Sequence, residues 1–399
     1  MRSTDPRRAH RLLRLSVLCV AALAACAHRQ QKYDVVIPPP PEPARYRLEF
    51  MYSGSNDYEG GSSAADALLG KKSAAESHNL FKPFSAVSDG KGLVYVSDTA
   101  KPPRVEVFDD VKKQVRLIGT EGEGRLVLPL GMALDPAGDL YVADAKLRTV
   151  FHFDPGGAFK GTFGSKDTLE RPTAVAVDAP RGLLYVCDTG GHRIQVYTLA
   201  DAKLLRTIGK RGNGPGELNY PEGLTVGSDG RVYVVDALNF RYQVFDADGK
   251  FVATHGQIGQ EPGSFARPKG IALDSDGHVY VSDAAFCNVQ VFDDQGRLLI
   301  WIGGPGAAPG QFQLTEGIFI DSADRLFVVD QMNKRVQRFR YFGEKKPAAS
   351  PPPVATPPTA AAPAAAVSTA AVSTGASTAG ASTAAPAAAA QASAPTPKP

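Results

Sequence analysis

The sequence predicts an all-β protein: a six-bladed β-propeller, closed by an N-terminal strand in its last blade and flanked by disordered termini. Three observations predict this fold: an aspartate that recurs about every 47 residues, strand-like segments at fixed offsets around it, and little helical periodicity. The spacings between successive aspartates are 46, 44, 48, 47 and 47 residues. These aspartates are Asp98, Asp144, Asp188, Asp236, Asp283 and Asp330. Six repeats of four strands each are typical of a closed ring of blades.

Each repeat contains four strand-like segments. The second segment ends in the repeated aspartate, as LVYVSD at residues 93–98 does. Within it, β-branched and aromatic residues alternate with other residues. The first segment lies upstream, as in PEGLTVG, and tight-turn residues such as the Ser-Asp-Gly at 228–230 join it to the second. The third and fourth segments follow, as in RYQVF and FVATHG. The repeat therefore predicts four-stranded antiparallel blades.

The ring needs a closing strand because the sixth repeat ends after its third strand, near Gly343. A strand-like segment at 46–54, YRLEFMYSG, precedes the first repeat and resembles the fourth-strand segment LLIWIG. An open edge blade would expose unpaired backbone groups. We therefore expect the N-terminal segment to complete the last blade, and the propeller to cover residues 46–343.

The first 25 residues are typical of an export signal. Arginines precede an apolar run of eleven residues, 15–25, which is too short to span a bilayer. The run ends in Leu-Ala-Ala before Cys26, which resembles the lipobox of bacterial lipoproteins. The resemblance implies that Cys26 is acylated and holds the protein in the cell envelope, and Ala27 favours the outer membrane, at its periplasmic face or the surface. An ordinary cleaved signal with a chance cysteine is the alternative.

Two further segments flank the predicted propeller. Residues 26–45 include four consecutive prolines, which favour an extended polyproline II tether between the lipid and the propeller. Residues 344–399 are mostly Ala, Pro, Ser and Thr with almost no charge, so they have too little apolar surface to fold alone. We expect a disordered tail there.

The overall charge excludes an electrostatic role in binding nucleic acid. The formal net charge is +3, but the first 25 residues hold five arginines and one aspartate, which leaves 39 basic and 40 acidic residues elsewhere. A neutral body gives no reason to expect nucleic acid as a partner. Four cysteines in 399 residues also exclude a disulfide-stabilised scaffold.

The segment at 213–251 carries a family resemblance. Its sequence, NGPGELNYPEGLTVGSDGRVYVVDALNFRYQVFDADGKF, resembles the NHL-repeat family of six-bladed propellers. The glycine-rich connection, the proline before the first strand, the aspartate and the following arginine recur over residues 46–343. The resemblance implies the fold, whereas function is left open because such propellers serve many roles.

The repeated aspartates are expected to fix loop shape. An arginine follows five or six residues later in four repeats, as with Asp236 and Arg241, so that the pair can meet across the loop after the second strand. The second repeat has Arg148 one place early, and the fifth has Asn288 instead. Ligand binding by these aspartates is the less favoured interpretation.

The best candidate binding residues lie where the first strands begin. The residue after the repeated proline position should ring the mouth of the central channel, and two aromatic residues lie in neighbouring loops of the same face. The ring residues are Phe84, Leu130, Thr173, Glu222, Lys269 and Glu316, and the loop residues are Phe240 and Phe286. Aromatic and charged groups in a concavity suit ligand or peptide recognition, so Glu222, Lys269, Glu316, Phe240 and Phe286 are the predicted ligand-binding set. The alternative is that the charges pair only with one another.

Nothing in the sequence identifies a catalytic or metal site. NHL-like amidating lyases are expected to place histidines of several blades around a channel zinc, but here His152, His192 and His255 occupy non-equivalent positions. Cys187 and Cys287 lie in blades that are not neighbours, so we expect two separate thiols. We therefore expect no metal and no cofactor, and a binding module is favoured over an enzyme.

Together these observations predict a membrane-anchored scaffold of the cell envelope. Its partner is expected to be a protein, a peptide or an envelope polymer, with the membrane contacted through the acyl chains on Cys26 and no nucleic acid bound. A metal-dependent lyase or lactonase-like propeller enzyme is the alternative function.

Overall fold

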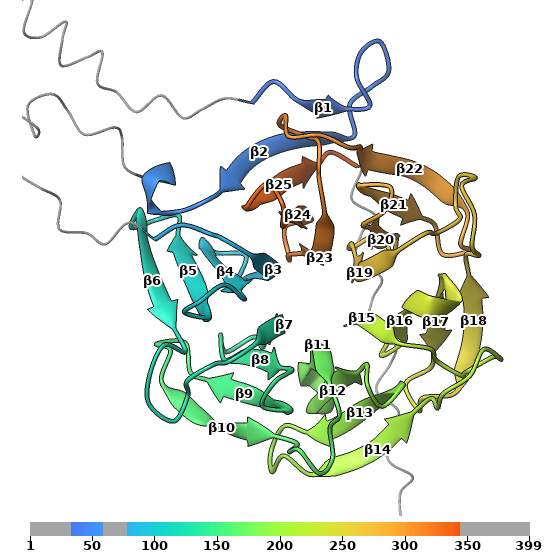
Figure 1. Cartoon of the computed structure of the whole chain (residues 1–399). Helices are drawn as coiled ribbons and strands as arrows, with labels where there is room; N and C mark the ends of the chain where they lie inside the picture. The colour runs from blue at the N-terminus through green and yellow to red at the C-terminus, as the bar shows by residue number, and fades with distance from the viewer. Residues whose placement is uncertain (1–32, 59–77, 344–399) are drawn as a thin grey trace, which may run out of the picture. The chain divides into compact units, whose positions relative to one another are not determined.

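The computed structural model describes residues 33–58 and 78–343, and these form a ring of six antiparallel sheets around a central axis (Figure 1). Each sheet is one blade, and its first strand lies nearest the axis. In the described residues the only helical segments are three single 3-10 turns, which are Ser55–Asp57, Ala179–Arg181 and Ala237–Asn239. The predicted all-β, six-bladed propeller is confirmed.

The first five blades each consist of four consecutive strands. Blade 1 comprises β3 (Pro83–Ser88), β4 (Leu93–Asp98), β5 (Arg104–Asp109) and β6 (Gln114–Ile118). Blade 2 comprises β7 (Pro129–Leu134), β8 (Leu140–Asp144), β9 (Thr149–Phe153) and β10 (Phe159–Phe163). Blade 3 comprises β11 (Pro172–Asp178), β12 (Leu183–Asp188), β13 (Arg193–Thr198) and β14 (Leu204–Ile208). Blade 4 comprises β15 (Pro221–Val226), β16 (Val232–Asp236), β17 (Arg241–Phe245) and β18 (Phe251–His255). Blade 5 comprises β19 (Pro268–Leu273), β20 (Val279–Asp283), β21 (Asn288–Phe292) and β22 (Leu298–Gly303).

The sixth blade combines strands from both ends of the described chain. It contains β23 (Thr315–Ile320), β24 (Arg325–Asp330) and β25 (Arg335–Tyr341), and β2 (Tyr46–Tyr52) pairs antiparallel with β25 as the fourth strand. The register places Tyr46 opposite Tyr341. The predicted closure by an N-terminal strand is therefore confirmed. A short strand that the sequence did not predict, β1 (Val36–Ile37), adds a fifth strand outside β2 (Figure 1).

The hydrophobic core lies between the blades. Alternate side chains of a strand point to opposite faces of its sheet, so each blade contributes to two of the six buried clusters. In β4, for example, Tyr95 packs toward blade 2, while Val94 and Val96 pack toward blade 6. Because every blade face is covered by a neighbour, the ring depends on the presence of all six blades.

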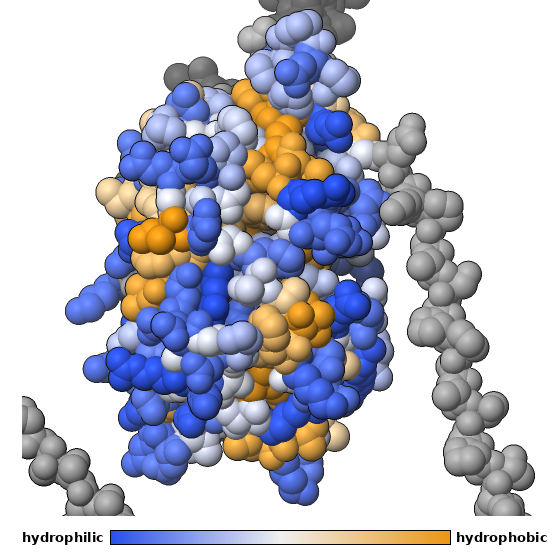
Figure 2. Space-filling view, turned by 90° about the vertical axis from the view of Figure 1, so that its right-hand side faces the viewer, coloured by the Kyte–Doolittle hydropathy of each residue, from blue (hydrophilic) through white to orange (hydrophobic). Residues whose placement is uncertain are grey.

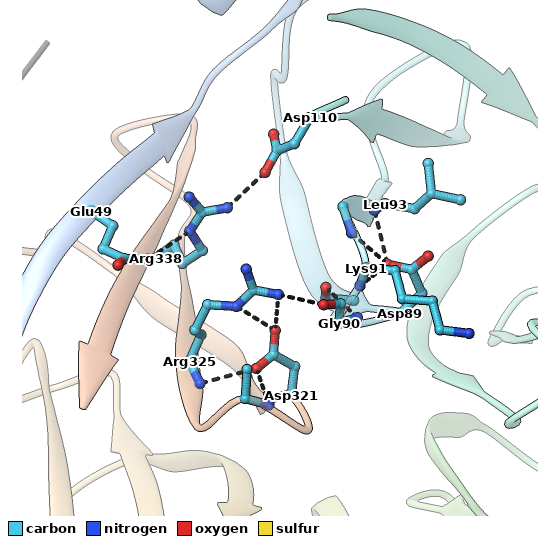
Figure 3. A network of polar contacts seen from close by, with 12 residues as sticks. Glu49, Asp89, Gly90, Lys91, Leu93, Asp110, Asp321, Arg325 and Arg338 are labelled. Carbon is cyan, nitrogen blue, oxygen red and sulfur yellow. Dashed lines mark hydrogen bonds and ion pairs between the residues drawn. The ribbon is translucent and has the colours of Figure 1, made fainter. Parts of the chain in front are cut away.

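The junction between blades 6 and 1 also carries a polar network, shown in Figure 3. The Arg338 guanidinium of β25 lies 2.7 Å from the Asp110 carboxylate beyond β5 and 3.4 Å from Glu49 of β2. The Tyr52 and Tyr58 hydroxyls donate to the same Asp110 carboxylate at 2.8 and 2.6 Å. The network thus ties the closing strand to β25 of its own blade through the Glu49–Arg338 ion pair and to blade 1 through charge-assisted hydrogen bonds to Asp110.

Candidate functional site

A β-bulge in every inner strand places the predicted ring residues at the channel mouth. The register of each first strand against the second shifts directly after the repeated proline position, as between Pro221 and Gly223 in blade 4. The same shift occurs in the other five blades. A bulge leaves one residue unpaired and redirects its side chain. The cavity at this mouth is lined by all the predicted ring residues except Leu130.

Small residues after the ring position let the inner strands meet tightly around the axis. A Cβ atom on Gly223 would lie 2.5 Å from the Lys269 carbonyl oxygen, and one on Gly270 would lie 2.8 Å from the Ile318 nitrogen. The resulting mouth cavity measures about 60 Å³. A second cavity of about 260 Å³, lined by the inner strands of all six blades, lies farther along them. The channel is therefore narrow at the end that carries the charged residues.

The three charged ring residues form one electrostatic unit. The Lys269 ammonium donates to the Glu222 carboxylate at 2.5 Å. Glu316 is only 6% exposed, and the described residues show no hydrogen bond to its carboxylate. Burial raises the pKa of Glu316, the Glu222 charge raises it further, and the Lys269 charge lowers it. Thus two of the three predicted charges pair with one another, and the third is a buried carboxyl.

The blade 3 side of the mouth is neutral and hydrogen-bonded. Thr173 shares a 2.6 Å hydrogen bond with Thr189, whose hydroxyl also donates to the Pro221 carbonyl of the next blade. Cys187 is fully buried beside them, and burial raises the pKa of its thiol to about 12. A thiol with so high a pKa stays protonated and is a poor nucleophile at neutral pH.

The two predicted loop aromatics lie apart from this mouth. We refer to the side where the first strands begin and the second strands end as the upper face. Phe240 packs against the core between blades 4 and 5. Phe286 lines a separate cavity of about 220 Å³ together with Trp301 of β22. The structure thus brings Glu222, Lys269 and Glu316 together and places neither Phe240 nor Phe286 among the residues lining their cavity.

The repeated aspartates are all buried and accept backbone hydrogen bonds. Asp188, for example, accepts from the Glu170 and Arg171 nitrogens of the preceding connection at 2.9 and 2.8 Å. Four of the six also lie within ion-pair distance of the expected arginine. Each aspartate therefore ties the loop after the second strand to the connection that enters its own blade.

Sequence reasoning missed two features. Asp274, Asp276 and His278 place their side-chain ligand atoms within 4.8 Å of one another in the β19–β20 hairpin. Asp274 already accepts hydrogen bonds from Tyr280 and the backbone of its own turn, so the cluster has a structural role. The second feature is Trp301, whose position on an outer strand gave no signal in the repeat pattern.

The outer strands of three consecutive blades expose apolar side chains. Figure 2 shows hydrophobic patches on the side of the ring that carries β22 and β18. The exposed residues on the outer strands of blades 3 to 5 are Leu204, Leu205, Phe251, Val252, Leu299 and Trp301. A groove of about 690 Å³ lies between the segment around β1 and β22, and Trp301 lines it as well as the cavity beside Phe286.

Comparison with known families identifies part of the repeat. The model of the NHL repeat matches residues 169–197 and 218–245, and a family described as a 6-bladed beta-propeller matches residues 274–345. The chain contains NHL repeats. Their matched segments cover blades 3 and 4 from the connection before the first strand to the third strand.

Curated relatives share NHL repeats over short stretches. The chain is 33% identical over 129 residues to Protein brain tumor of Drosophila melanogaster, which covers 31% of this chain and 12% of that protein. It is 34% identical over 93 residues to human NHL repeat-containing protein 3, covering 22% and 27% of the two chains. Human E3 ubiquitin-protein ligase TRIM32 is 35% identical over 68 residues, which cover 17% of this chain and 10% of that protein. The matches thus span about a quarter or less of these relatives.

Solved structures share the fold. A protein of unknown function from Bacteroides thetaiotaomicron aligns with a TM-score of 0.54 at 17% identity, covering 66% of this chain and 70% of that one. A streptogramin B lyase aligns with a TM-score of 0.50 at 13% identity, covering 66% and 94%. At such identities the likeness concerns the fold alone and carries no activity over.

The membrane-related predictions fall largely outside the described residues. Cys26, the signal segment 1–25 and the tail 344–399 all lie outside them. Within 33–58 and 78–343, the structure contains no helix long and apolar enough to cross a bilayer.

Proposed function

We propose that this chain is a lipid-anchored NHL propeller of the bacterial cell envelope that binds a protein or peptide partner on its upper face. The narrow channel mouth carries this proposal. Small-molecule sites usually measure about 300–1,000 Å³, whereas the mouth cavity measures about 60 Å³. A cavity of this size suits contact by one side-chain head group better than enclosure of a substrate.

The chemistry of the upper face supports a macromolecular partner. The Glu222–Lys269 pair and the buried Glu316 supply polar groups at the centre, and Phe286 and Trp301 supply aromatic surface nearer the rim. Aromatic residues in pockets are frequent anchors of protein interfaces. NHL propellers also commonly mediate protein binding, while the lyase neighbours share only the fold with this chain.

Photo-crosslinking tests the binding face. A photoreactive residue at Leu238 or Met332, which are exposed in loops after β16 and β24, should yield adducts with an envelope protein in intact cells. The same residue at Val111, which is exposed in the β5–β6 hairpin on the opposite face, is the matched control. Adducts that form equally from Val111, or from none of the three positions, would contradict the proposal.

Cell fractionation tests the anchor separately. Cys26→Ser should move the protein from the membrane to the soluble fraction, because acyl chains contribute about 0.8 kcal/mol per buried methylene to membrane binding. Cys19→Ser, within the apolar run, is the control and should leave the protein membrane-bound. A Cys26→Ser protein that fractionates like the wild type would rule out the lipid anchor while leaving the crosslinking result intact.

A further inference from the structure

One arginine organises the loop after the second strand in blades 4 and 6. In blade 4 the Arg241 guanidinium lies 2.8 Å from the Asp236 carboxylate and donates to the Gly214 and Glu217 carbonyls at 2.9 and 3.0 Å. In blade 6 Arg335 forms the same ion pair with Asp330. A guanidinium suits such a site because its planar, fixed donors can reach a carboxylate and two carbonyls at once.

Blade 5 keeps the acceptors of this arrangement without the arginine. The Ser264 nitrogen donates to the Glu261 carbonyl at 2.9 Å, as Glu217 donates to Gly214 in blade 4 at 3.1 Å. Gln290 donates to the Ser264 carbonyl at 2.8 Å, just as Gln243 donates to that of Glu217 at 2.6 Å. The loop backbone is therefore equivalent in the two blades, and its carbonyls are in place.

Blade 5 lacks two side-chain donors that reach the repeated aspartate in blade 4. Asn288 stands opposite Asp283 in the register, where Arg241 stands opposite Asp236. Phe286 takes the place that Asn239 holds in blade 4, where the Asn239 amide donates to Asp236 at 2.8 Å.

Among the residues that the structure describes, Asp283 therefore has no cationic partner. It is fully buried, and across the described part of the chain its carboxylate accepts only from backbone nitrogens, which are those of Ala266, Arg267, Ala285 and Phe286. A buried carboxylate of this kind attracts a cation placed nearby more strongly than it would in water.

A cavity marks the place of the missing side chain. It measures about 220 Å³ and is lined by Gln260, Glu261, Pro262, Phe286, Asn288, Gln290 and Trp301. Asn288 is one of the lining residues, and its Oδ1 atom is buried and has no hydrogen-bond partner among the residues that the structure describes. Trp301 is half exposed beside it, and aromatic rings attract cations over their faces.

We propose that this cavity of blade 5 binds a guanidinium group, supplied by an arginine side chain of the partner protein. The guest supplies the cation that blades 4 and 6 carry within their own sequence. Asn288 Oδ1 and the Glu261 carbonyl accept its hydrogen bonds, and the aromatic rings flank its stem. The Asp283 carboxylate, which lies opposite Asn288 in the register but does not itself line the cavity, attracts its charge. This assignment names the partner's chemistry and rests on the binding role proposed above.

Trp301 is the only tryptophan of the chain, so its fluorescence reports directly on this cavity. Titration of the purified protein with N-acetyl-arginine amide should change the emission saturably. N-acetyl-citrulline amide has nearly the same shape without the charge and should bind at least about tenfold more weakly, a difference of about 1.4 kcal/mol. A wild-type protein that gives no saturable change, or binds both compounds equally, would overturn the proposal.

Asn288→Arg fills the cavity from within. It should remove arginine-amide binding and raise the melting temperature, because it restores the pair seen with Asp236 and Asp330. Gln295→Arg adds the same charge at an exposed position of the same blade and should change neither property. If Asn288→Arg does not fold, Asn288→Lys also places a cation there and should likewise abolish binding.

If folded Asn288→Arg or Asn288→Lys still binds N-acetyl-arginine amide as strongly as the wild type does, the site is refuted. The arginine titration can fail while the photo-crosslinked envelope partner is still found. That result would overturn this inference alone, and the proposed binding role would remain.

Discussion

The ionisation of Glu316 is governed by its burial at the channel mouth. Burial raises the pKa of this carboxyl above 4.5, and the Glu222 charge adds to the rise while the Lys269 charge opposes it. A carboxyl with a raised pKa in the folded state stabilises the fold below its unfolded-state pKa. That contribution is lost as the pH rises through the folded-state pKa. At neutral pH the raised pKa of the Glu316 carboxyl therefore costs stability relative to acidic pH.

We expect Glu316→Gln to raise the free energy of unfolding at pH 7.5 and to change it little at pH 4. The reason is that the amide stays neutral at every pH, and each unit of pKa shift corresponds to about 1.4 kcal/mol. Urea unfolding of both proteins between pH 4 and 8 measures the difference. Glu123→Gln, at an exposed position, should have no such effect. A wild-type protein that gains stability relative to Glu316→Gln as the pH rises would contradict the expectation.

The sequence located the ring residues but not their electrostatic states. The repeated proline position identified Glu222, Lys269 and Glu316 as neighbours, since each blade contributes the same position. Their pairing depends on contacts between blades and on the burial of each side chain, and a periodic pattern carries neither. Phe240 and Phe286 differ for a similar reason. Counted from the repeated aspartate of its own blade, each occupies a loop position one place apart from the other, so Phe240 packs into the core and Phe286 lines a cavity.

The loop after the second strand of blade 4 contains a buried ion pair between Asp236 and Arg241. In blade 4 Asp236 is fully buried and Arg241 is 13% exposed at its side chain. Removing one member of a buried pair leaves the other charge uncompensated. Blade 5 shows the same loop built without this pair, which provides an internal comparison.

We expect Arg241→Ala to lower the free energy of unfolding by about 3 kcal/mol because Asp236 would remain buried without its cation. Asn288→Ala in blade 5 is the matched control and should cost well under half as much, since Asp283 has no arginine to lose. Equilibrium urea unfolding followed by circular dichroism measures both. Equal losses in the two variants would show that the arginine does not stabilise the loop.

Among the elements, the repeated strands could be predicted and the irregular ones could not. Alternation of β-branched and aromatic residues indicated the second strand of each blade, and the other strands were predicted from segments at fixed offsets around it. Strand β1 has only two residues, Val36 and Ile37, and lies within the proline-rich segment, so no periodicity marks it. The inner-strand bulges also escaped prediction, because a shift of register between two paired strands leaves no mark in the alternation of either strand.

At the scale of the whole molecule, the ring is closed by one strand from far away in the sequence. The contact between β2 and β25 joins residues almost 300 positions apart, and the Arg338–Asp110 pair extends it to blade 1 (Figure 3). The buried Tyr46 and Tyr52 of β2 belong to the clusters on either side of blade 6. Closure therefore completes two interfaces at once.

We expect deletion of residues 46–52 to abolish cooperative unfolding, because it removes the fourth strand of blade 6 and leaves β25 as an open edge. Thermal unfolding followed by circular dichroism should lose its single sharp transition, and the protein should aggregate. A chain that begins at residue 44 lacks β1 but keeps β2, and it should melt cooperatively with only a modest loss of stability. If the deletion variant melts like this control, the β2–β25 contact is dispensable and the ring is held by the remaining blade interfaces alone.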